Sequence, residues 1–198
     1  SLERARGAID NSLGRMVKKE KISADDAQSI LGRVSFETSL TAAKGSQWAV
    51  EAIPEEEKLK EDVLSGLDEN VDEGGVIASN TSSISITRLA SYTKRPERFV
   101  GMHFMNPVPI MKLVEIINGD DTSEATNQAV VKAAETMGKT ALSCNDAPGF
   151  VSNRILCPMI NEAILTLQEG VAEPEAIDGI MKLGMNHPIG PLALADLI

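Results

Sequence analysis

The fold is decided by two stretches of sequence, SNTSSIS at residues 79–85 and HFMNPVPIMKLVEII at residues 103–117. The first follows a short apolar run and the second ends in one, so each marks a buried strand. Pro107 and Pro109 restrict the backbone of the intervening loop. A serine cluster, a histidine and a glutamate are thereby predicted to meet in an apolar setting, and we expect the chemistry of the protein to lie there.

Strands alternate with helices on both sides of these stretches. Short apolar runs predict the strands, and periodic apolar residues, opened by proline and acids or ended by glycine, predict the helices. The predicted strands cover residues 48–52 (expected to be buried), 76–78, 99–103, 113–117 and 140–144, and the predicted helices cover 54–72, 84–90 and 123–137. This alternation predicts a Rossmann-like, doubly wound parallel sheet of the α/β class, whose ligands gather at the carboxyl ends of its strands.

The amino-terminal part of the chain predicts a helical hairpin. Residues 2–17 space their apolar side chains as an amphipathic helix does. Ser23 followed by Asp26 is typical of a capping box, which opens a second, short helix. Residues 34–36 then predict a short strand.

The pattern changes after the turn Asp146-Ala147-Pro148-Gly149. Residues 150–170 form a long predicted helix with a wide apolar face, so we expect it to be mostly buried. A further helix is predicted at 174–184. This change divides the chain into an α/β domain at 1–147 and an all-helical domain at 148–198.

Composition bounds what the chain binds and where it works. Its 198 residues carry 19 basic and 29 acidic side chains, and the net charge of −10 disfavours binding to nucleic acid or anionic membranes. No apolar run approaches the roughly 18 residues of a membrane span, and no secretory signal or transit peptide is recognisable. Cys144 and Cys157 are interpreted as buried free thiols of a reducing compartment, so we expect a cytoplasmic protein.

Three residues of the opening stretches are candidates for catalysis. His103 ends a predicted buried strand, where a histidine on its own is more often a hydrogen-bonded core residue. Glu115 lies twelve positions later among apolar neighbours, where a carboxylate could accept an imidazole N–H and raise the basicity of the ring; alternatively, it is an exposed strand residue. Ser82 follows a strand and could cap the next helix, bind a ligand, or do both.

Other residue types add little chemistry. Asn153 lies in the first turn of the long helix and joins the site only if that helix faces the first domain, and His187 is interpreted as a loop residue. Two histidines and two dispersed cysteines match no zinc pattern, so we expect no metal site. The sequence contains no nucleophile elbow, Walker loop or glycine-rich dinucleotide fingerprint.

Five linked motifs carry a family resemblance. They are SNTSSISIT (79–87), GMHFMNPVPIMKLVE (101–115), DAPGFVSNRIL (146–156), EAIDGIMKLG (175–184) and HPIGPLALADLI (187–198). Together they closely resemble the short-chain 3-hydroxyacyl-CoA dehydrogenases, most of all the bacterial 3-hydroxybutyryl-CoA group, over essentially the whole chain. Met105 stands where many relatives have phenylalanine, an apolar exchange that we do not expect to alter the reaction.

The resemblance implies hydride transfer between NAD(H) and a 3-hydroxyacyl-CoA/3-oxoacyl-CoA pair. His103 would be the general acid/base, and Glu115 would orient it and stabilise its charged form. Ser82 and Asn153 would hydrogen-bond the substrate oxygens and hold the reacting carbon near the nicotinamide.

The resemblance also implies a cofactor site and a dimer. Residues expected to bind NAD are Glu55, Lys60, Ser82 and Asn106. Family members begin with a strand, a GxGxxG turn and a second strand, a unit of roughly 30 residues, and continue through further helices that form much of a dimer interface. We therefore expect the chain to be cut at both ends and the full-length protein to be a homodimer. NADP is left open, because the discriminating residue would lie in that first unit.

Three alternatives remain open. A related NAD-dependent hydroxyacid dehydrogenase would act on another substrate. The dehydrogenase segment of a multifunctional β-oxidation protein would follow a crotonase domain. A non-catalytic descendant could keep the fold as a structural or binding module, although the complete set of Ser82, His103, Glu115 and Asn153 disfavours it. Fatty-acid and butyrate metabolism are both compatible with the sequence.

Overall fold

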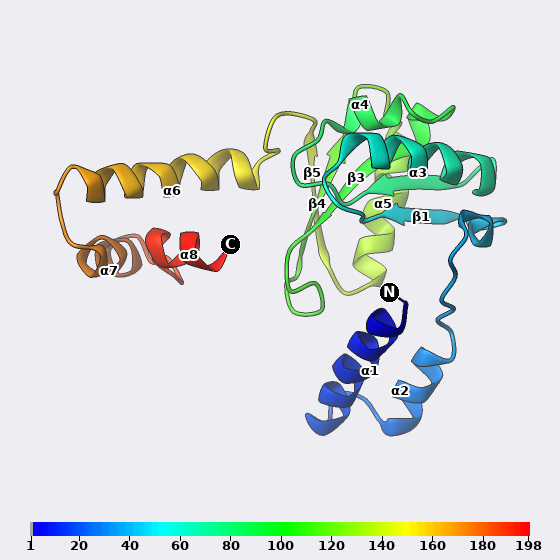
Figure 1. The fold of residues 1–198 in the computed structure, drawn as a ribbon, viewed down its shortest axis with the longest axis horizontal. Coiled ribbons are helices and arrows are strands. Elements are labelled where there is room, and N and C mark those ends of the chain that lie inside the picture. Colours follow the sequence, from blue (N-terminus) through cyan, green and yellow to red (C-terminus); the bar gives the residue numbers. More distant parts are fainter. Residues whose placement is uncertain (1) are drawn as a thin grey trace.

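A mixed five-stranded sheet forms the centre of the computed structural model, which describes residues 2–198 (Figure 1). Its strands lie in the order β1 (Trp48–Glu51), β2 (Val76–Ser79), β3 (Phe99–Phe104), β4 (Leu113–Asn118) and β5 (Thr140–Asn145). The helices of the described residues are α1 (Leu2–Lys18), α2 (Ala24–Leu31), α3 (Glu57–Asn70), α4 (Ile86–Ala90), α5 (Glu124–Thr136), α6 (Ser152–Gln168), α7 (Pro174–Gly184) and α8 (Pro191–Leu197), with short 3₁₀ turns at Leu40–Ala43 and Pro96–Arg98. The predicted α/β class is confirmed.

The prediction of an all-parallel sheet is wrong at one place. Strands β1, β2 and β3 pair in parallel, as do β4 and β5, but β3 and β4 are antiparallel. A parallel return needs a crossover of about a dozen residues or more, usually with a helix. The loop 105–112 between β3 and β4 contains no helix, so the chain turns back beside itself.

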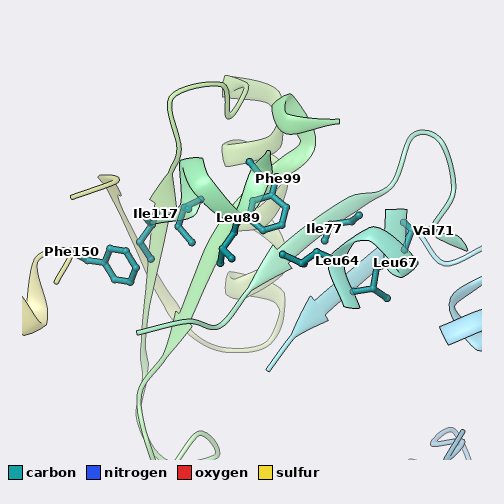
Figure 2. Packing of buried hydrophobic residues seen from close by; sticks show 10 residues of the cluster. Leu64, Leu67, Val71, Ile77, Leu89, Phe99, Ile117 and Phe150 are labelled. Carbon is teal, nitrogen blue, oxygen red and sulfur yellow. The ribbon is translucent and has the colours of Figure 1, made fainter. Parts of the chain in front are cut away.

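Helices cover both faces of the sheet, as the doubly wound prediction requires. On one face, α3 and α4 pack on the sheet through a cluster shown in Figure 2 and made up of Leu64, Leu67, Val71, Ile77, Ile86, Leu89, Ala90, Phe99, Ile117 and Phe150. On the other face, Val130 of α5 packs against alternate residues of β2, β3 and β4. Residues 99–104 therefore send odd-numbered side chains to the α3/α4 face and even-numbered ones to the α5 face.

Gly101 lets α4 approach the sheet closely. A Cβ atom built on it would lie 2.8 Å from Cβ of Ile117 and 2.9 Å from Cδ1 of Ile86. Those side chains lie in the buried cluster under α4. A larger residue at position 101 would therefore displace α4 from the sheet.

The predicted helical hairpin is confirmed, but the strand predicted at 34–36 is wrong. Helices α1 and α2 form the hairpin, and Ser23 and Asp26 make both bonds of the capping box. Residues 34–36 have no strand partner. The Phe36 ring lies under the Arg6 guanidinium instead, 6.0 Å from centroid to Cζ. Figure 1 shows the hairpin standing off from the sheet at the end of an extended tether.

Strand β1 and helix α3 also differ from expectation. The strand is present, but Trp48 and Val50 are exposed and only Glu51 is buried, because β1 is an edge strand of the described sheet. Helix α3 begins at Glu57 and not at Pro54.

The long helix α6 is present, but the prediction that it is mostly buried is wrong. Figure 1 shows it extending away from the sheet, with α7 and α8 along one side of it. Only Ile160 and Ala163 of the helix are buried, and Ile155 is 64% exposed. Cys157, predicted to be buried, is exposed for the same reason. Among residues 2–198, no helix is long and apolar enough to cross a membrane.

Candidate active site

His103 and Glu115 are directly paired across the antiparallel strands β3 and β4. Side chains of opposed residues lie on the same face of a sheet with Cβ atoms about 5 Å apart, and the His103 Nδ1 atom lies 2.8 Å from Glu115 Oε2. Both side chains are buried, with 6% of His103 and 4% of Glu115 exposed. The prediction that Glu115 is a buried partner of the histidine is therefore confirmed in geometry, and its alternative as an exposed strand residue is excluded.

Three donors converge on the Glu115 carboxylate. Oε2 accepts from His103 Nδ1–H and from the Ser152 hydroxyl at 2.7 Å, while Oε1 accepts from the Ser152 backbone N–H at 3.0 Å. Burial alone would raise the pKa of Glu115, but the bonds from Ser152 and His103 outweigh it and hold that pKa below its usual value. Glu115 is therefore ionised at neutral pH and can only accept hydrogen bonds, which places the proton of a neutral His103 ring on Nδ1.

Ser82 completes a hydrogen-bonded series with these two residues. Its Oγ atom lies 3.0 Å from His103 Nε2. Because Nδ1 carries the proton, Nε2 of the neutral ring has its lone pair free and accepts from the serine hydroxyl. Ser82 is not a helix cap, since Ser85 caps α4 by accepting from the Arg88 N–H. The ring nitrogen that could take a proton from a ligand thus faces Ser82.

The loop after β2 is fixed by the carboxylate of Glu55, which follows β1. Glu55 accepts from the Ser82 backbone N–H at 3.0 Å, from the Thr81 hydroxyl at 2.7 Å and from the Ser83 hydroxyl at 3.4 Å. The structure thereby brings the predicted cofactor residue Glu55 next to Ser82, at the carboxyl ends of β1 and β2. Hydroxyls, carboxylates and backbone amides at this edge match a group that presents ribose hydroxyls and a carboxamide.

Lys60 lies beneath this edge. Its side chain is fully buried, and its Nζ atom donates to Glu51 Oε1 at 2.7 Å and to the Ile53 carbonyl at 3.1 Å. The other oxygen of Glu51 accepts from the Ser79 hydroxyl at 2.6 Å. The contact of Lys60 with a cofactor stays a prediction, and in this structure the residue joins α3 to the ends of β1 and β2.

Helix α6 meets the site through its first turn. Asn153 donates from Nδ2 to the Ser82 carbonyl oxygen at 3.2 Å, so the condition for counting Asn153 in the site is met. Gly149 (φ +78°) and Phe150 (φ +51°) make the turn before the helix. A Cβ atom on Gly149 would lie 2.8 Å from the backbone nitrogen of Arg154, so the turn requires glycine there. The Phe150 ring packs edge-on against the His103 ring, with centroids 5.8 Å apart. The turn thus brings Ser152, Asn153 and an apolar wall to the histidine.

Asn106, like Lys60, is a predicted site residue that the structure does not bring into the series of Ser82, His103 and Glu115. It is exposed in the loop after β3, and its contact with a cofactor stays a prediction. His187, which we interpreted as a loop residue, lies between α7 and α8. Within residues 2–198, no group of three or more histidine, cysteine, aspartate or glutamate side chains could hold a metal ion.

Sequence reasoning missed Ser152, which contacts Glu115, and Asp146, which joins the turn before α6 to the start of α4. Ser152 could not be singled out, because residues 150–170 are identified as a helix from the spacing of their apolar side chains, and that spacing assigns no role to a serine. Asp146 lies in the turn before α6 and accepts from the Ser85 hydroxyl at 2.6 Å and from the Thr87 N–H at 2.9 Å. The clustering of polar residues at 146, 152 and 153 around a Pro-Gly turn was the available signal.

Comparison with known proteins assigns this site to a family. The family model described as "3-hydroxyacyl-CoA dehydrogenase, NAD binding domain" matches residues 1–147, and "3-hydroxyacyl-CoA dehydrogenase, C-terminal domain" matches residues 149–198. The chain belongs to the 3-hydroxyacyl-CoA dehydrogenase family. The resemblance drawn from the motifs is thereby confirmed.

Relatives within the 3-hydroxyacyl-CoA dehydrogenase family agree with this assignment. A protein of Deinococcus radiodurans named probable 3-hydroxybutyryl-CoA dehydrogenase is 56% identical over 197 residues, and the match covers 100% of this chain and 70% of the relative. The 3-hydroxybutyryl-CoA dehydrogenase of Clostridioides difficile is 46% identical, with 100% and 70% covered. The crystal structure of (S)-3-hydroxybutyryl-CoA dehydrogenase from Ralstonia eutropha superposes with a TM-score of 0.96 at 50% identity, again covering 100% of this chain and 70% of that one.

Proposed function

We propose that this chain carries the acid/base site of an oxidoreductase that transfers a hydride between NAD(H) and a 3-hydroxyacyl-CoA/3-oxoacyl-CoA pair. The short pair, 3-hydroxybutyryl-CoA and acetoacetyl-CoA, is the proposed substrate, because the Deinococcus, Clostridioides and Ralstonia relatives are named for it. The observation that carries the proposal is the series from Ser82 through His103 to Glu115, in which Nε2 is the ring nitrogen free to exchange a proton.

In the oxidation direction, His103 Nε2 takes the proton of the substrate 3-hydroxyl. The resulting imidazolium donates from both nitrogens, and the ionised Glu115 stabilises it through Nδ1–H. The Ser82 hydroxyl, which lies 3.0 Å from Nε2, marks where the substrate oxygen would enter. Ser82 and Asn153 would then hold the substrate oxygens, and reduction runs through the same groups in reverse.

The cofactor would lie along the carboxyl ends of β1, β2 and β3. NAD, when bound, would accept the hydride that leaves C3, the carbon whose hydroxyl oxygen gives its proton to His103. Glu55 and Ser82 would bind its ribose, and Asn106, in the loop after β3, would reach its carboxamide. Lys60 would need to leave Glu51 to bind it directly; in its present position it supports the loop that carries Ser82.

The test is acetoacetyl-CoA-dependent oxidation of NADH, followed at the nicotinamide absorbance. It is run on the chain itself and on a chimera that adds the segments of the Deinococcus relative lying outside the matched region, because the chain spans 70% of that relative. We expect the chimera to oxidise NADH when acetoacetyl-CoA is present and to stop when acetoacetyl-CoA is omitted. A folded chimera that binds NADH but oxidises none of it with acetoacetyl-CoA would contradict the proposal, and activity with another hydroxyacid would favour the hydroxyacid dehydrogenase alternative.

Replacing Glu115 by glutamine should lower kcat about 10- to 100-fold while changing the KM for acetoacetyl-CoA less than about threefold. The neutral amide cannot stabilise the imidazolium as a carboxylate does, whereas no part of the proposed CoA contact depends on Glu115. Steady-state kinetics at several pH values measure the two effects separately. Equal losses of kcat and of acyl-CoA affinity would rule out an orienting role.

The association state and the compartment are also proposed. We propose a homodimer that uses the helical part of the chain, where Leu183 is 90% exposed and an apolar groove of about 340 Å³ is lined by Met159, Ala163, Val171, Ile177, Ile180 and Met181. Sedimentation velocity of the chimera should give a dimer that Leu183→Glu converts to a monomer, and an unchanged dimer would exclude this face. We further propose that the enzyme works in the cytoplasm, in fatty-acid or butyrate metabolism.

A further inference from the structure

Ser152 is the part of the helical segment that contacts the catalytic pair most directly. It is the first residue of α6, and both its backbone N–H and its hydroxyl donate to Glu115, at 3.0 and 2.7 Å. Two of the three hydrogen bonds to this carboxylate therefore come from a helix that otherwise projects away from the sheet (Figure 1). Glu115 in turn satisfies a backbone donor at the start of α6, which has no side-chain cap of its own.

We propose that Ser152 is a positioning residue of the dehydrogenase reaction, which fixes the Glu115 carboxylate toward His103 and moderates how strongly it stabilises the imidazolium. This inference rests on the proposed function. The backbone N–H holds Oε1, which leaves Oε2 turned toward Nδ1 of the histidine. The hydroxyl donates to that same Oε2 and so shares the oxygen with the ring.

The shared oxygen gives the hydroxyl a specific effect. A carboxylate oxygen that accepts two donors has less negative charge available for each of them than an oxygen that accepts one. Loss of the Ser152 hydroxyl should therefore strengthen the bond from Nδ1–H to Oε2 and favour the imidazolium. It should also free the carboxylate to rotate about its remaining contacts, and turnover should fall.

Few other titratable groups bear on this change. From β5, Cys144 approaches Glu115, and its thiol pKa is raised by burial and then by the negative charges of Glu115 and Asp146. The thiol therefore stays neutral across the range in which an imidazole titrates. From β3, the facing group is His103 itself. A shift in the titration of His103 can thus be assigned to the lost hydroxyl.

The experiment compares Ser152→Ala with the parent protein by NMR titration of the imidazole signals and by the pH dependence of kcat. The backbone N–H to Oε1 persists in the alanine variant, so the start of α6 keeps its partner. We expect the His103 titration midpoint to rise by about half a pH unit, the size expected for one lost hydrogen bond. We expect kcat to fall about three- to tenfold with KM changed less than about twofold.

Two variants make the result specific. Ser152→Thr retains a hydroxyl and should keep the midpoint and kcat of the parent. Ser91→Ala removes a hydroxyl that donates to the Arg88 carbonyl at the end of α4, and it should change neither quantity. His187→Asn assigns the signals, since the chain has two histidines. A midpoint in Ser152→Ala within about 0.1 pH unit of the parent would overturn the inference.

The NMR titration also separates this inference from the proposed function, because it needs no turnover. A shifted midpoint in a protein that oxidises no NADH with acetoacetyl-CoA would reject the proposed reaction and retain the role of Ser152 in holding Glu115. Turnover with an unshifted midpoint would do the reverse.

Discussion

Replacing His103 by glutamine should reduce kcat for acetoacetyl-CoA reduction by about 10²- to 10⁴-fold, the range contributed by a positioned acid/base group. Glutamine has nearly the length of histidine and can still hydrogen-bond to Glu115 and Ser82, so the site keeps its polar contacts. It cannot take up or release a proton near neutral pH. The expected loss therefore measures the proton transfer at Nε2, the atom that faces Ser82.

Binding and folding provide the controls for this variant. The Kd for NADH, measured by fluorescence titration, should change less than about threefold. Glu55 holds the loop that carries Ser82 through bonds that do not involve the His103 ring. Circular dichroism should confirm an unchanged helix content. A His103→Gln enzyme with kcat within about tenfold of the parent would exclude His103 as the acid/base.

Replacing Lys60 by methionine should produce the largest loss of stability of the substitutions considered, about 3–5 kcal/mol in the free energy of unfolding. Methionine fills most of the space of the lysine stem but leaves the Glu51 carboxylate, which is 2% exposed, without its charged partner. Guanidinium or urea unfolding at pH 7 measures the effect. A loss below about 1 kcal/mol, the range of exposed ion pairs, would contradict this prediction.

Helix α3 offers a matched control two residues away. Lys58 forms ion pairs with Glu61 and Asp62 on the surface, and Lys58→Met should leave the unfolding midpoint close to that of the parent, because exposed pairs contribute little. The double variant Glu51→Gln with Lys60→Met should recover part of the loss, because neither partner then leaves a buried unpaired charge.

The catalytic pair could be predicted from sequence because burial and spacing both pointed to it. Apolar neighbours on each side of Glu115 favour a buried carboxylate, and a buried carboxylate needs a partner. His103 was the one histidine beside a predicted strand. The direct pairing of the two residues could not be predicted, because it depends on the antiparallel register of β3 and β4 and the periodicity of a strand says nothing about its neighbour's direction.

The errors about burial concern elements whose exposure is set by tertiary contacts. The wide apolar face of α6 was read as a buried face, whereas α7 and α8 cover only one side of the helix in the described residues. The roles of Ser152 and Lys60 depend on contacts with distant strands. The burial of Lys60 could be predicted from its spacing. It lies four residues before Leu64, on the same helical face as Leu67 and Val71, and that face is buried.

The cross-strand pairing of His103 and Glu115 makes the catalytic geometry a property of two strands and not of the loop between them. The backbone ladder between β3 and β4 holds the pair in place, while the loop 105–112 that joins the strands is largely exposed and takes no part in that ladder. Changes at loop positions other than Asn106 therefore need not shift the acid/base pair. The geometry of proton transfer is therefore set by the strand register, and an engineer could alter loop positions other than Asn106 while that geometry is inherited unchanged.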